Sequence, residues 1–167
     1  GEQNIPYTEF DKANPINYYG KSKSNGESLV LNEYEKVFII RTSSVFGLGN
    51  NFINNIITQS KIKNELKVVT DQISSPTYSN DLAYFSFELL KTDKFGIYHI
   101  TNNDECSKFE LAKYVLNKIN YKGFLKEALS EEFNSPALRP KYSKLNTLKT
   151  ELLLNQSIQS WQKAIDC

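Results

Sequence analysis

The sequence of 167 residues predicts an α/β fold with a parallel sheet. Three short apolar runs, at 37–40, 66–70 and 96–100, have the length and composition of buried strands. Between them lie segments in which apolar residues recur at helical spacing. The expected helices are 15–33, 52–62, 81–91 and 107–119, followed by a short helix near 145–153 and a last turn around Trp161.

Residues at the expected helix starts support these boundaries. Pro15 suits a first helical turn, where its missing N–H costs nothing, and Asn14 suits the N-cap before it. Asn51 is expected to cap the second helix, and the charge of Asp81 suits the first turn of the third. Ser107-Lys-Phe-Glu110 has the pattern of a capping box. Three strands still make a thin sheet, and no strand precedes the first helix, so we expect the second half of a larger domain.

Composition and charge narrow the classes of function. The 20 basic and 19 acidic residues give a net charge of +1 and are mixed along the chain. The sequence therefore lacks the electrostatic footprint of a nucleic-acid or membrane-surface protein, and no apolar run has the length that spans a bilayer. Cys106 and Cys167 lack metal-site spacing and are too few for a disulfide framework, which favours a cytoplasmic protein without a metal site.

Tyr19 and Lys23 are the first candidates for chemistry. They lie four residues apart in Asn14-Pro-Ile-Asn-Tyr-Tyr-Gly-Lys-Ser-Lys23. Side chains at positions i and i+4 share one helix face, so a phenol and an ammonium there can reach one ligand. A lysine charge favours the phenolate form of a nearby tyrosine, which suits a general acid or base near neutral pH.

Tyr114 and Lys118 have the same spacing, and chance alone produces about one such pair in a chain of this composition. This second pair lies in 109–119, where apolar residues recur at helical spacing, so we interpret Tyr114 as half-buried packing and Lys118 as its solvated neighbour. The neighbours of Tyr19 are instead small and polar, which leaves room for a ligand. Spacing and surroundings alone leave both the catalytic and the structural interpretation of Tyr19 open.

Polar side chains with hydroxyl groups follow the first expected strand. Residues 41–47, Arg-Thr-Ser-Ser-Val-Phe-Gly, replace hydrocarbons with hydroxyls, and ligands of open α/β sheets bind at the carboxyl ends of strands. Gly47 and Gly49 begin like a dinucleotide fingerprint, but Phe52 occupies the third glycine position, so we interpret both as turn glycines.

His99, the only histidine, lacks ligand-type neighbours and is interpreted as a core or hydrogen-bonded residue. Trp161 is interpreted as a packing residue.

In this order, the segments resemble the C-terminal part of the extended short-chain dehydrogenase/reductases, in particular the dTDP-4-dehydrorhamnose reductases. The resemblance runs almost end to end. The matching motifs are 14–23 with Gly26-Glu27, 41–47, Asn51-Phe52, Asp71-Gln72 with Pro76-Thr77, Asp81-Leu-Ala83, Gly96-Ile-Tyr-His99, Arg139-Pro140 and Trp161. One position departs from the family: many of these reductases carry a tryptophan where this sequence has Ser44, so an aromatic wall of the substrate pocket would be missing.

For the fold, the resemblance implies the C-terminal portion of a Rossmann-like parallel sheet with a small, mostly helical substrate-binding region. The N-terminal half that holds the cofactor would be absent from this chain. Residues 1–65 would end the Rossmann-like domain and carry the Tyr-x-x-x-Lys helix, and residues 66–167 would form the substrate-binding region and closing helices. We accordingly expect the chain alone to be inactive and to bind dinucleotide weakly.

For function, the resemblance implies NADPH- or NADH-dependent reduction of the 4-keto group of a nucleotide-linked deoxysugar, in the synthesis of cell-surface polysaccharide precursors. Tyr19 and Lys23 would be catalytic, and together with Thr42 and Ser43 they would contact the cofactor. The expected substrate contacts are Ser44, Asn51, Phe52, Gln72 and Arg139. The planar guanidinium of an arginine suits a diphosphate. The expected partners are the nucleotide sugar and a second subunit in a homodimer.

Two other functions stay open on the same fold. One is a non-catalytic regulatory or binding subunit, because folds are reused without their chemistry. The other is an epimerase or dehydratase of sugar nucleotides, in which NAD stays bound and no net oxidation occurs. Retention of Tyr19 and Lys23 argues against the first, whereas Ser44 is mildly in its favour.

Overall fold

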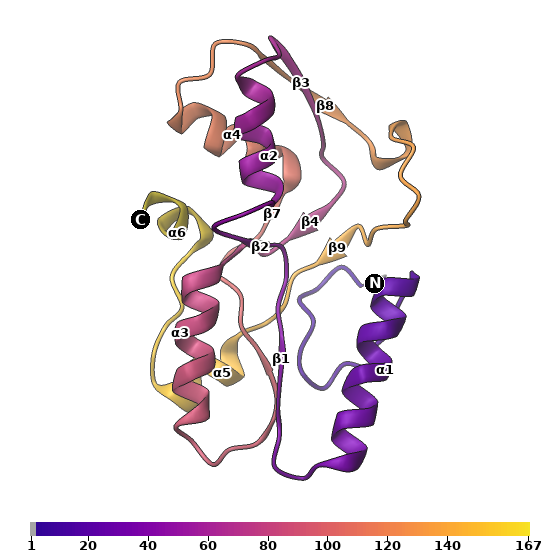
Figure 1. Ribbon diagram of the computed structural model, residues 1–167, viewed down its shortest axis with the longest axis vertical. Helices are drawn as coiled ribbons and strands as arrows, with labels where there is room; N and C mark the ends of the chain where they lie inside the picture. Colours follow the sequence, from indigo (N-terminus) through magenta and orange to yellow (C-terminus); the bar gives the residue numbers. More distant parts are fainter. Residues whose placement is uncertain (1–2) are drawn as a thin grey trace.

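The computed structural model describes residues 3–167, in which helices and short strands alternate (Figure 1). The helices are α1 (Tyr18–Glu33), α2 (Phe52–Ser60), α3 (Ser79–Leu90), α4 (Lys108–Lys118), α5 (Leu148–Leu154) and α6 (Trp161–Asp166), with one 3-10 turn, η1 (Ser130–Glu132). The strands are β1 (Phe38–Arg41), β2 (Val45–Phe46), β3 (Glu65–Val69), β4 (Ile73–Ser74), β5 (Thr77–Tyr78), β6 (Gly96–His99), β7 (Cys106–Ser107), β8 (Phe124–Ala128) and β9 (Tyr142–Ser143). None of the helices in this part of the chain is both long and apolar enough to cross a bilayer.

Most strand pairs are parallel, as expected for an α/β chain. β1 pairs with β6, β2 with β5 and β3 with β8, all in parallel, while β4 is parallel to β9 and antiparallel to β7. The expected strands do not share one sheet, however, because β3 pairs with β8 and not with β1 or β6. Figure 1 places β3, β8, α2 and α4 at one end of the molecule, and α1, β1, α3 and α5 at the other.

The sequence predicts no strand at β8, because charged and exposed side chains obscure its pattern. Lys126 and Glu127 are exposed, and only Ala128 at the end of β8 is buried. The Lys126 ammonium lies 2.7 Å from the Glu65 carboxylate on β3. β8 is thus an edge strand whose partner comes from a distant part of the chain, which local pattern does not reveal.

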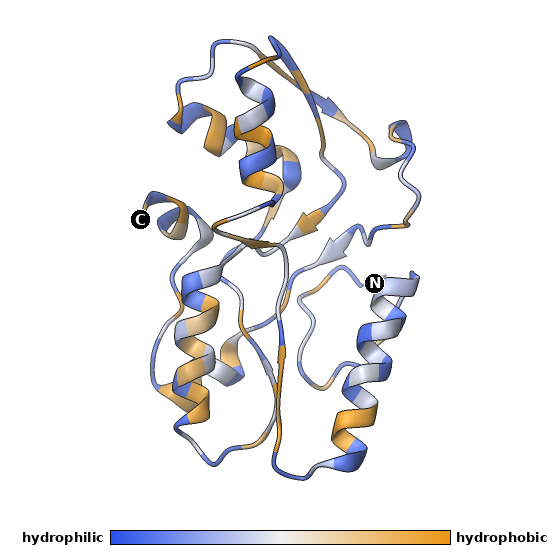
Figure 2. Ribbon diagram, in the orientation of Figure 1, coloured by the Kyte–Doolittle hydropathy of each residue, from blue (hydrophilic) through white to orange (hydrophobic). Residues whose placement is uncertain are grey.

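The core consists of three apolar clusters. One joins α2, α4 and α6 around Trp161, one lies between α2, α4 and β3, and one lies between α3 and β6. Figure 2 shows the apolar residues of α3 and β1 as orange segments. Trp161 is only 4% exposed and packs edge-on against Tyr114, with ring centroids 5.1 Å apart. Its interpretation as a packing residue is confirmed.

α1 begins later than predicted, and its cap differs. The helix starts at Tyr18, and Asn17, not Asn14, is the N-cap: its side-chain oxygen accepts a hydrogen bond from Gly20 N at 2.8 Å. Pro15 therefore lies outside the helix, two residues before the N-cap. A Cβ added to Gly20 would lie 3.1 Å from the Pro15 Cβ, so Gly20 permits this close approach.

The surface formed by α1 and β1 is more exposed than predicted. No residue of α1 is buried, and all four residues of β1 are only half-buried, although the sequence predicts a strand buried on both faces. β1 pairs on one edge only within the described residues, which leaves its other edge open. Leu29 of α1 and Tyr34, the C-cap residue that follows it, are 70% and 61% exposed.

Candidate functional site

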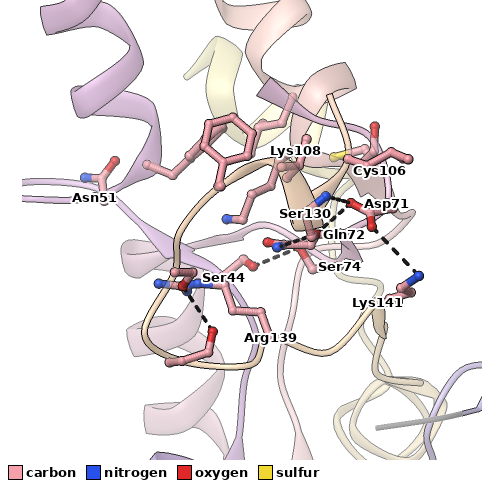
Figure 3. Close-up of a pocket in the computed structure, with 18 of the residues that line it drawn as sticks. Ser44, Asn51, Asp71, Gln72, Ser74, Cys106, Lys108, Ser130, Arg139 and Lys141 are labelled. Atoms are coloured by element: carbon pink, nitrogen blue, oxygen red, sulfur yellow. Dashed lines mark hydrogen bonds and ion pairs between the residues drawn. The ribbon is translucent and has the colours of Figure 1, made fainter. Parts of the chain in front are cut away.

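A cavity of about 1170 Å³ opens between the first residues of α2, the first residues of α4 and the segment that follows β8 (Figure 3). All five residues predicted to contact a substrate line it: Ser44, Asn51, Phe52, Gln72 and Arg139. They come from three segments of the sequence, at 44–52, 72 and 139. The structure therefore brings this set together, while the role of each residue remains a prediction.

Side-chain hydrogen bonds of Asn51 and Ser44 hold two segments of the cavity lining in place. The Asn51 side chain accepts from Asn54 N at 3.0 Å and donates to Gly47 O at 2.8 Å, so it caps α2 as predicted and holds the preceding loop. Ser44 has φ +45°, and its hydroxyl donates to Ser74 Oγ at 2.8 Å. A left-handed serine costs on the order of 1 kcal/mol, and surrounding bonds must hold it in place.

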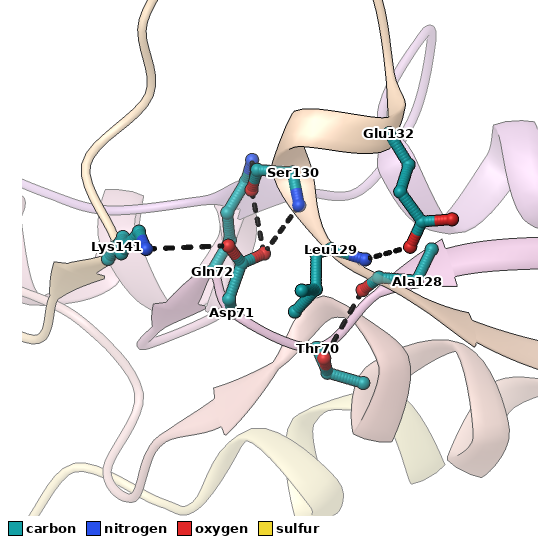
Figure 4. Close-up of polar contacts among 8 residues, drawn as sticks. All are labelled: Thr70, Asp71, Gln72, Ala128, Leu129, Ser130, Glu132 and Lys141. Carbon is teal, nitrogen blue, oxygen red and sulfur yellow. Dashed lines mark hydrogen bonds and ion pairs between the residues drawn. The ribbon is translucent and has the colours of Figure 1, made fainter.

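Gln72 belongs to a network that fixes the far wall of the cavity (Figure 4). Its amide nitrogen donates to Ser130 Oγ at 2.9 Å. Ser130 in turn donates to Asp71 Oδ1 from both its backbone N, at 2.9 Å, and its hydroxyl, at 2.7 Å. Lys141 lies 4.0 Å from the other Asp71 oxygen. Asp71 and Gln72 therefore attach η1 to the loop between β3 and β4.

Lys108 lines the same cavity, although the sequence alone did not single it out. It is the first residue of α4, and its ammonium lies 4.5 Å from the centroid of the Phe52 ring. Burial lowers the pKa of Lys108, and the positive charge of Arg139 lowers it further. One signal could have identified it: a lysine at the positive N-terminal end of a helix is electrostatically unfavourable, so an anion is the natural partner there.

Tyr19 and Lys23 lie outside this cavity, on the exposed surface of α1. The Lys23 ammonium is 5.4 Å from the centroid of the Tyr19 ring, and Tyr19 is 72% exposed. Glu27 follows at the same i+4 spacing and accepts hydrogen bonds from Arg41, the last residue of β1, at 2.7 to 3.1 Å. This ion pair turns the Tyr19–Lys23 face of α1 toward the carboxyl end of β1, where Thr42 follows.

A direct hydrogen bond joins α1 to the cavity. The amide nitrogen of Asn17 donates to Leu138 O at 2.8 Å, and Leu138 lines the cavity next to Arg139. Asn17 also caps α1 two residues before Tyr19. The helix that carries the candidate acid–base pair is therefore attached to the rim of the candidate substrate cavity.

The residues predicted to contact a nicotinamide are accessible, whereas the described residues offer no glycine cradle for a dinucleotide diphosphate. Tyr19 and Lys23 are exposed on α1, and of the two residues that follow β1, Thr42 is exposed and Ser43 is half-buried. Gly47 and Gly49 are turn glycines as interpreted, with φ of +152° and +87°. A Cβ at Gly47 would collide with the Ser79 hydroxyl, so this glycine makes room for Ser79 and not for a phosphate.

The two residues interpreted as structural are confirmed as such. His99 is 1% exposed, its backbone N donates to Glu9, and its Nδ1 lies 3.1 Å from Asn146 O. Burial lowers the pKa of His99, partly offset by the charge of Glu9. Tyr114 is half-buried, and its hydroxyl donates to Asp166 at 2.9 Å, so it is committed to packing.

An α/β chain with parallel strand pairs and a helix that carries Tyr-x-x-x-Lys has the fold of the Rossmann-like short-chain dehydrogenase/reductases. The family model described as RmlD substrate binding domain matches residues 1–167, and the chain belongs to this family. The resemblance to extended reductases that the sequence motifs carry is thereby confirmed.

The similarity of the chain to individual proteins supports this assignment. The chain is 38% identical to the spore coat polysaccharide biosynthesis protein SpsK of Bacillus subtilis, over 87% of this chain and 52% of that protein. It is 32% identical to a dTDP-4-dehydrorhamnose reductase of Aggregatibacter actinomycetemcomitans, over 99% of this chain and 60% of that protein. The solved dTDP-4-dehydrorhamnose reductase of Bacillus anthracis, in complex with NADP, superposes with a TM-score of 0.95 at 38% identity, covering 99% of this chain and 59% of that one. The chain thus spans less than two thirds of each of these relatives.

Proposed function

We propose that the whole protein reduces the 4-keto group of a nucleotide-linked deoxysugar with NADPH or NADH. The reaction would be of the same type as the reduction of dTDP-4-dehydrorhamnose to dTDP-rhamnose. This chain would contribute the acid–base pair and most of the substrate cavity. One observation carries the proposal: the five predicted substrate contacts line one cavity, and the rim of that cavity is hydrogen-bonded to the cap of the helix that bears Tyr19 and Lys23. The names of the relatives support the choice of substrate class.

The residues of this chain would handle the proton. A reduced nicotinamide, when bound, supplies hydride to the ketone carbon, and negative charge develops on the ketone oxygen. The Tyr19 hydroxyl donates its proton to that oxygen, which completes the alcohol. The Lys23 ammonium stabilises the phenolate that remains on Tyr19. Thr42 and Ser43, after β1, would contact the nicotinamide side of the cofactor.

The substrate would lie in the cavity with its sugar toward α1. Ser44 and Gln72 would border the sugar, Phe52 would offer an aromatic face, and Arg139 would pair with the diphosphate. Asn51 would act mainly by holding the loop before α2. The hydrogen bond between Asn17 and Leu138 supports this arrangement because it connects the two parts of the site.

We further propose a cytoplasmic location, which the two unpaired cysteines, Cys106 and Cys167, support. The homodimer remains a prediction, and sedimentation of the full-length protein in an analytical ultracentrifuge would test it. The division of the chain at residue 65 also remains a prediction.

The product of the reaction tests the proposed function. The full-length protein is incubated with NADPH and a dTDP-4-keto-6-deoxysugar, and NADPH absorbance and the NMR spectrum of the sugar are followed together. We expect one NADPH oxidised for each C4 alcohol formed. A changed sugar without NADPH oxidation would indicate an epimerase or dehydratase. Binding of the nucleotide sugar with neither change would indicate a non-catalytic subunit.

A further inference from the structure

Two cations face the cavity from opposite walls. Lys108 extends from the first residue of α4 and Arg139 from the segment before β9, and both reach into the same space (Figure 3). Neither forms an ion pair with a carboxylate within residues 3–167. Lys141, which lines the cavity as well, differs because it lies 4.0 Å from Asp71 and its side chain is 81% exposed.

The position of Lys108 is unfavourable unless an anion is present. The side chain of Lys108 is half-buried, its ammonium lies near enough to Arg139 for the two positive charges to repel, and it is carried at the N-terminal end of α4, where the helix dipole is positive. The face of the Phe52 ring, 4.5 Å away, offsets part of this cost. A partly buried cation without a counter-charge is otherwise destabilising, so the arrangement is that of a site prepared for a negatively charged group.

The acidic residues of the cavity do not cancel this charge. Asp71 accepts two hydrogen bonds from Ser130 and lies near Lys141, so its charge is already compensated. Glu131 is the other carboxylate among the lining residues, and it is exposed. The half-buried Lys108 and the exposed Arg139 therefore remain as two cations on the cavity lining without a carboxylate partner among residues 3–167, and a diphosphate bridge carries two negative charges.

We infer that Lys108 is a specificity-determining residue that, together with Arg139, binds the diphosphate of a nucleoside diphosphate ligand in this cavity. Arg139 supplies a planar fork that pairs with two phosphate oxygens, and Lys108 supplies a point charge from the opposite wall. The inference rests on the proposed function in one respect, which is that the ligand is a nucleotide sugar. Lys108 makes the cavity select for the diphosphate over the bare nucleoside.

Binding measurements on the full-length protein test this role without any reduction step. The probes are dTDP, titrated by calorimetry, and thymidine, titrated by ligand-detected NMR. Lys108→Met keeps the length of the side chain against Phe52 and removes the charge. We expect it to weaken dTDP binding about 10- to 100-fold, the range of one charge-assisted hydrogen bond, and to change thymidine binding less than about 2-fold.

Two further variants separate charge from packing. Lys108→Arg keeps the charge and is expected to retain dTDP affinity within about 5-fold. Lys113→Met removes a positive charge from an exposed position of the same helix, outside the cavity, and is expected to leave dTDP binding unchanged. A weaker dependence of dTDP affinity on salt in Lys108→Met than in Lys113→Met would support direct ion pairing.

Several results would overturn the inference. These are normal dTDP affinity in Lys108→Met, equal weakening of dTDP and thymidine, or no dTDP binding by the unmodified protein. Failure of the proposed reduction would be distinguishable from these results, because a protein that binds dTDP through Lys108 but oxidises no NADPH would retain the inference and lose the proposed activity.

Discussion

α1 and α4 each carry a tyrosine followed four residues later by a lysine. In both pairs the ammonium lies over the phenol ring, 5.4 Å from the centroid of Tyr19 and 5.5 Å from that of Tyr114. The surroundings differ. Tyr114 packs against Trp161 and donates its hydroxyl to Asp166, and this hydrogen bond raises the pKa of Tyr114. Tyr19 is 72% exposed and lies two residues beyond a cap that contacts the cavity rim.

The Tyr-x-x-x-Lys spacing by itself does not determine whether the tyrosine hydroxyl is free to take part in chemistry. The same i, i+4 geometry produces nearly the same contact between lysine and ring in both helices. What differs is the environment of the hydroxyl, because the Tyr114 hydroxyl already donates to a carboxylate, which holds its proton more tightly. The useful sequence signal is therefore the character of the neighbours, apolar and periodic around Tyr114 but small and polar around Tyr19.

The largest effect should come from removing the two hydroxyls in turn. Tyr19→Phe in the full-length protein is expected to lower kcat for reduction of the sugar nucleotide by about 10²- to 10⁴-fold, the usual contribution of a positioned proton donor. Tyr114→Phe removes the same atom from the matched pair and is expected to change kcat less than about 2-fold, since its partner is an exposed carboxylate. Initial rates of NADPH oxidation measure both. Near-normal turnover by Tyr19→Phe would remove the proposed role of Tyr19.

Packing around Tyr114 should control stability and not chemistry. Trp161→Ala removes the ring that Tyr114 contacts, in a cluster where Trp161 is 4% exposed, and is expected to lower the free energy of unfolding by about 3–5 kcal/mol. Lys163→Ala, at an exposed position of α6, is the control and is expected to change it by less than about 0.5 kcal/mol. Urea denaturation measures both. Equal losses in the two variants would contradict the packing assignment.

Local patterns identified much of the fold and little of the site. Caps with side-chain signatures were predictable, as at Asn51 and in the capping box of Ser107 and Glu110, which the structure confirms. The start of α1 was not, because Asn14 and Asn17 are both suitable caps in sequence and the structure uses Asn17. β8 was missed because its partner β3 lies far away in the sequence.

Even less of the site than of the fold could be predicted from local sequence patterns. The convergence of Ser44 and Arg139 on one cavity is a tertiary fact, and only the family resemblance, not periodicity, named both in advance. Lys108 belongs to none of the family motifs, and it becomes a candidate only when its position on the cavity lining with Arg139 is known. Sequence alone therefore identified Tyr19 and Lys23 as candidates, but not the cavity whose rim is hydrogen-bonded to the cap of their helix.

Two variants of Asn17 should distinguish its role as the cap of α1 from its role in positioning α1 at the cavity rim. Asn17→Asp keeps a side-chain oxygen for Gly20 N but loses the donor to Leu138 O, whereas Asn17→Ala loses both. We expect kcat/KM to fall about 2- to 10-fold in Asn17→Asp, the range of one hydrogen bond, with little loss of stability. Asn17→Ala should lose about 1 kcal/mol of stability as well. Unchanged kcat/KM in Asn17→Asp would show that the contact with Leu138 does not position α1.

The smallest effect concerns Asp166, which distinguishes the second pair from the first. Hydrogen bonds from Lys118 and from Tyr114 hold the pKa of Asp166 below its ordinary value of 3.8. A lowered carboxyl pKa contributes stability that is present above 3.8 and is lost as pH falls through the folded-state pKa. Asp166→Asn should therefore lower Tm slightly at pH 7, and the difference from the unmodified protein should shrink at about pH 3.

The same variant should also release the Tyr114 hydroxyl. Without the carboxylate, the pKa of Tyr114 should fall toward its ordinary value of 10, as followed by NMR of ring-labelled tyrosines. Tyr142 is the internal control, because burial and its hydrogen bond to Glu105 raise its pKa to about 12 independently of Asp166. A Tyr114 titration that did not move in Asp166→Asn would mean that Asp166 does not set the difference between the two pairs, and that the exposure of Tyr19 must account for it alone.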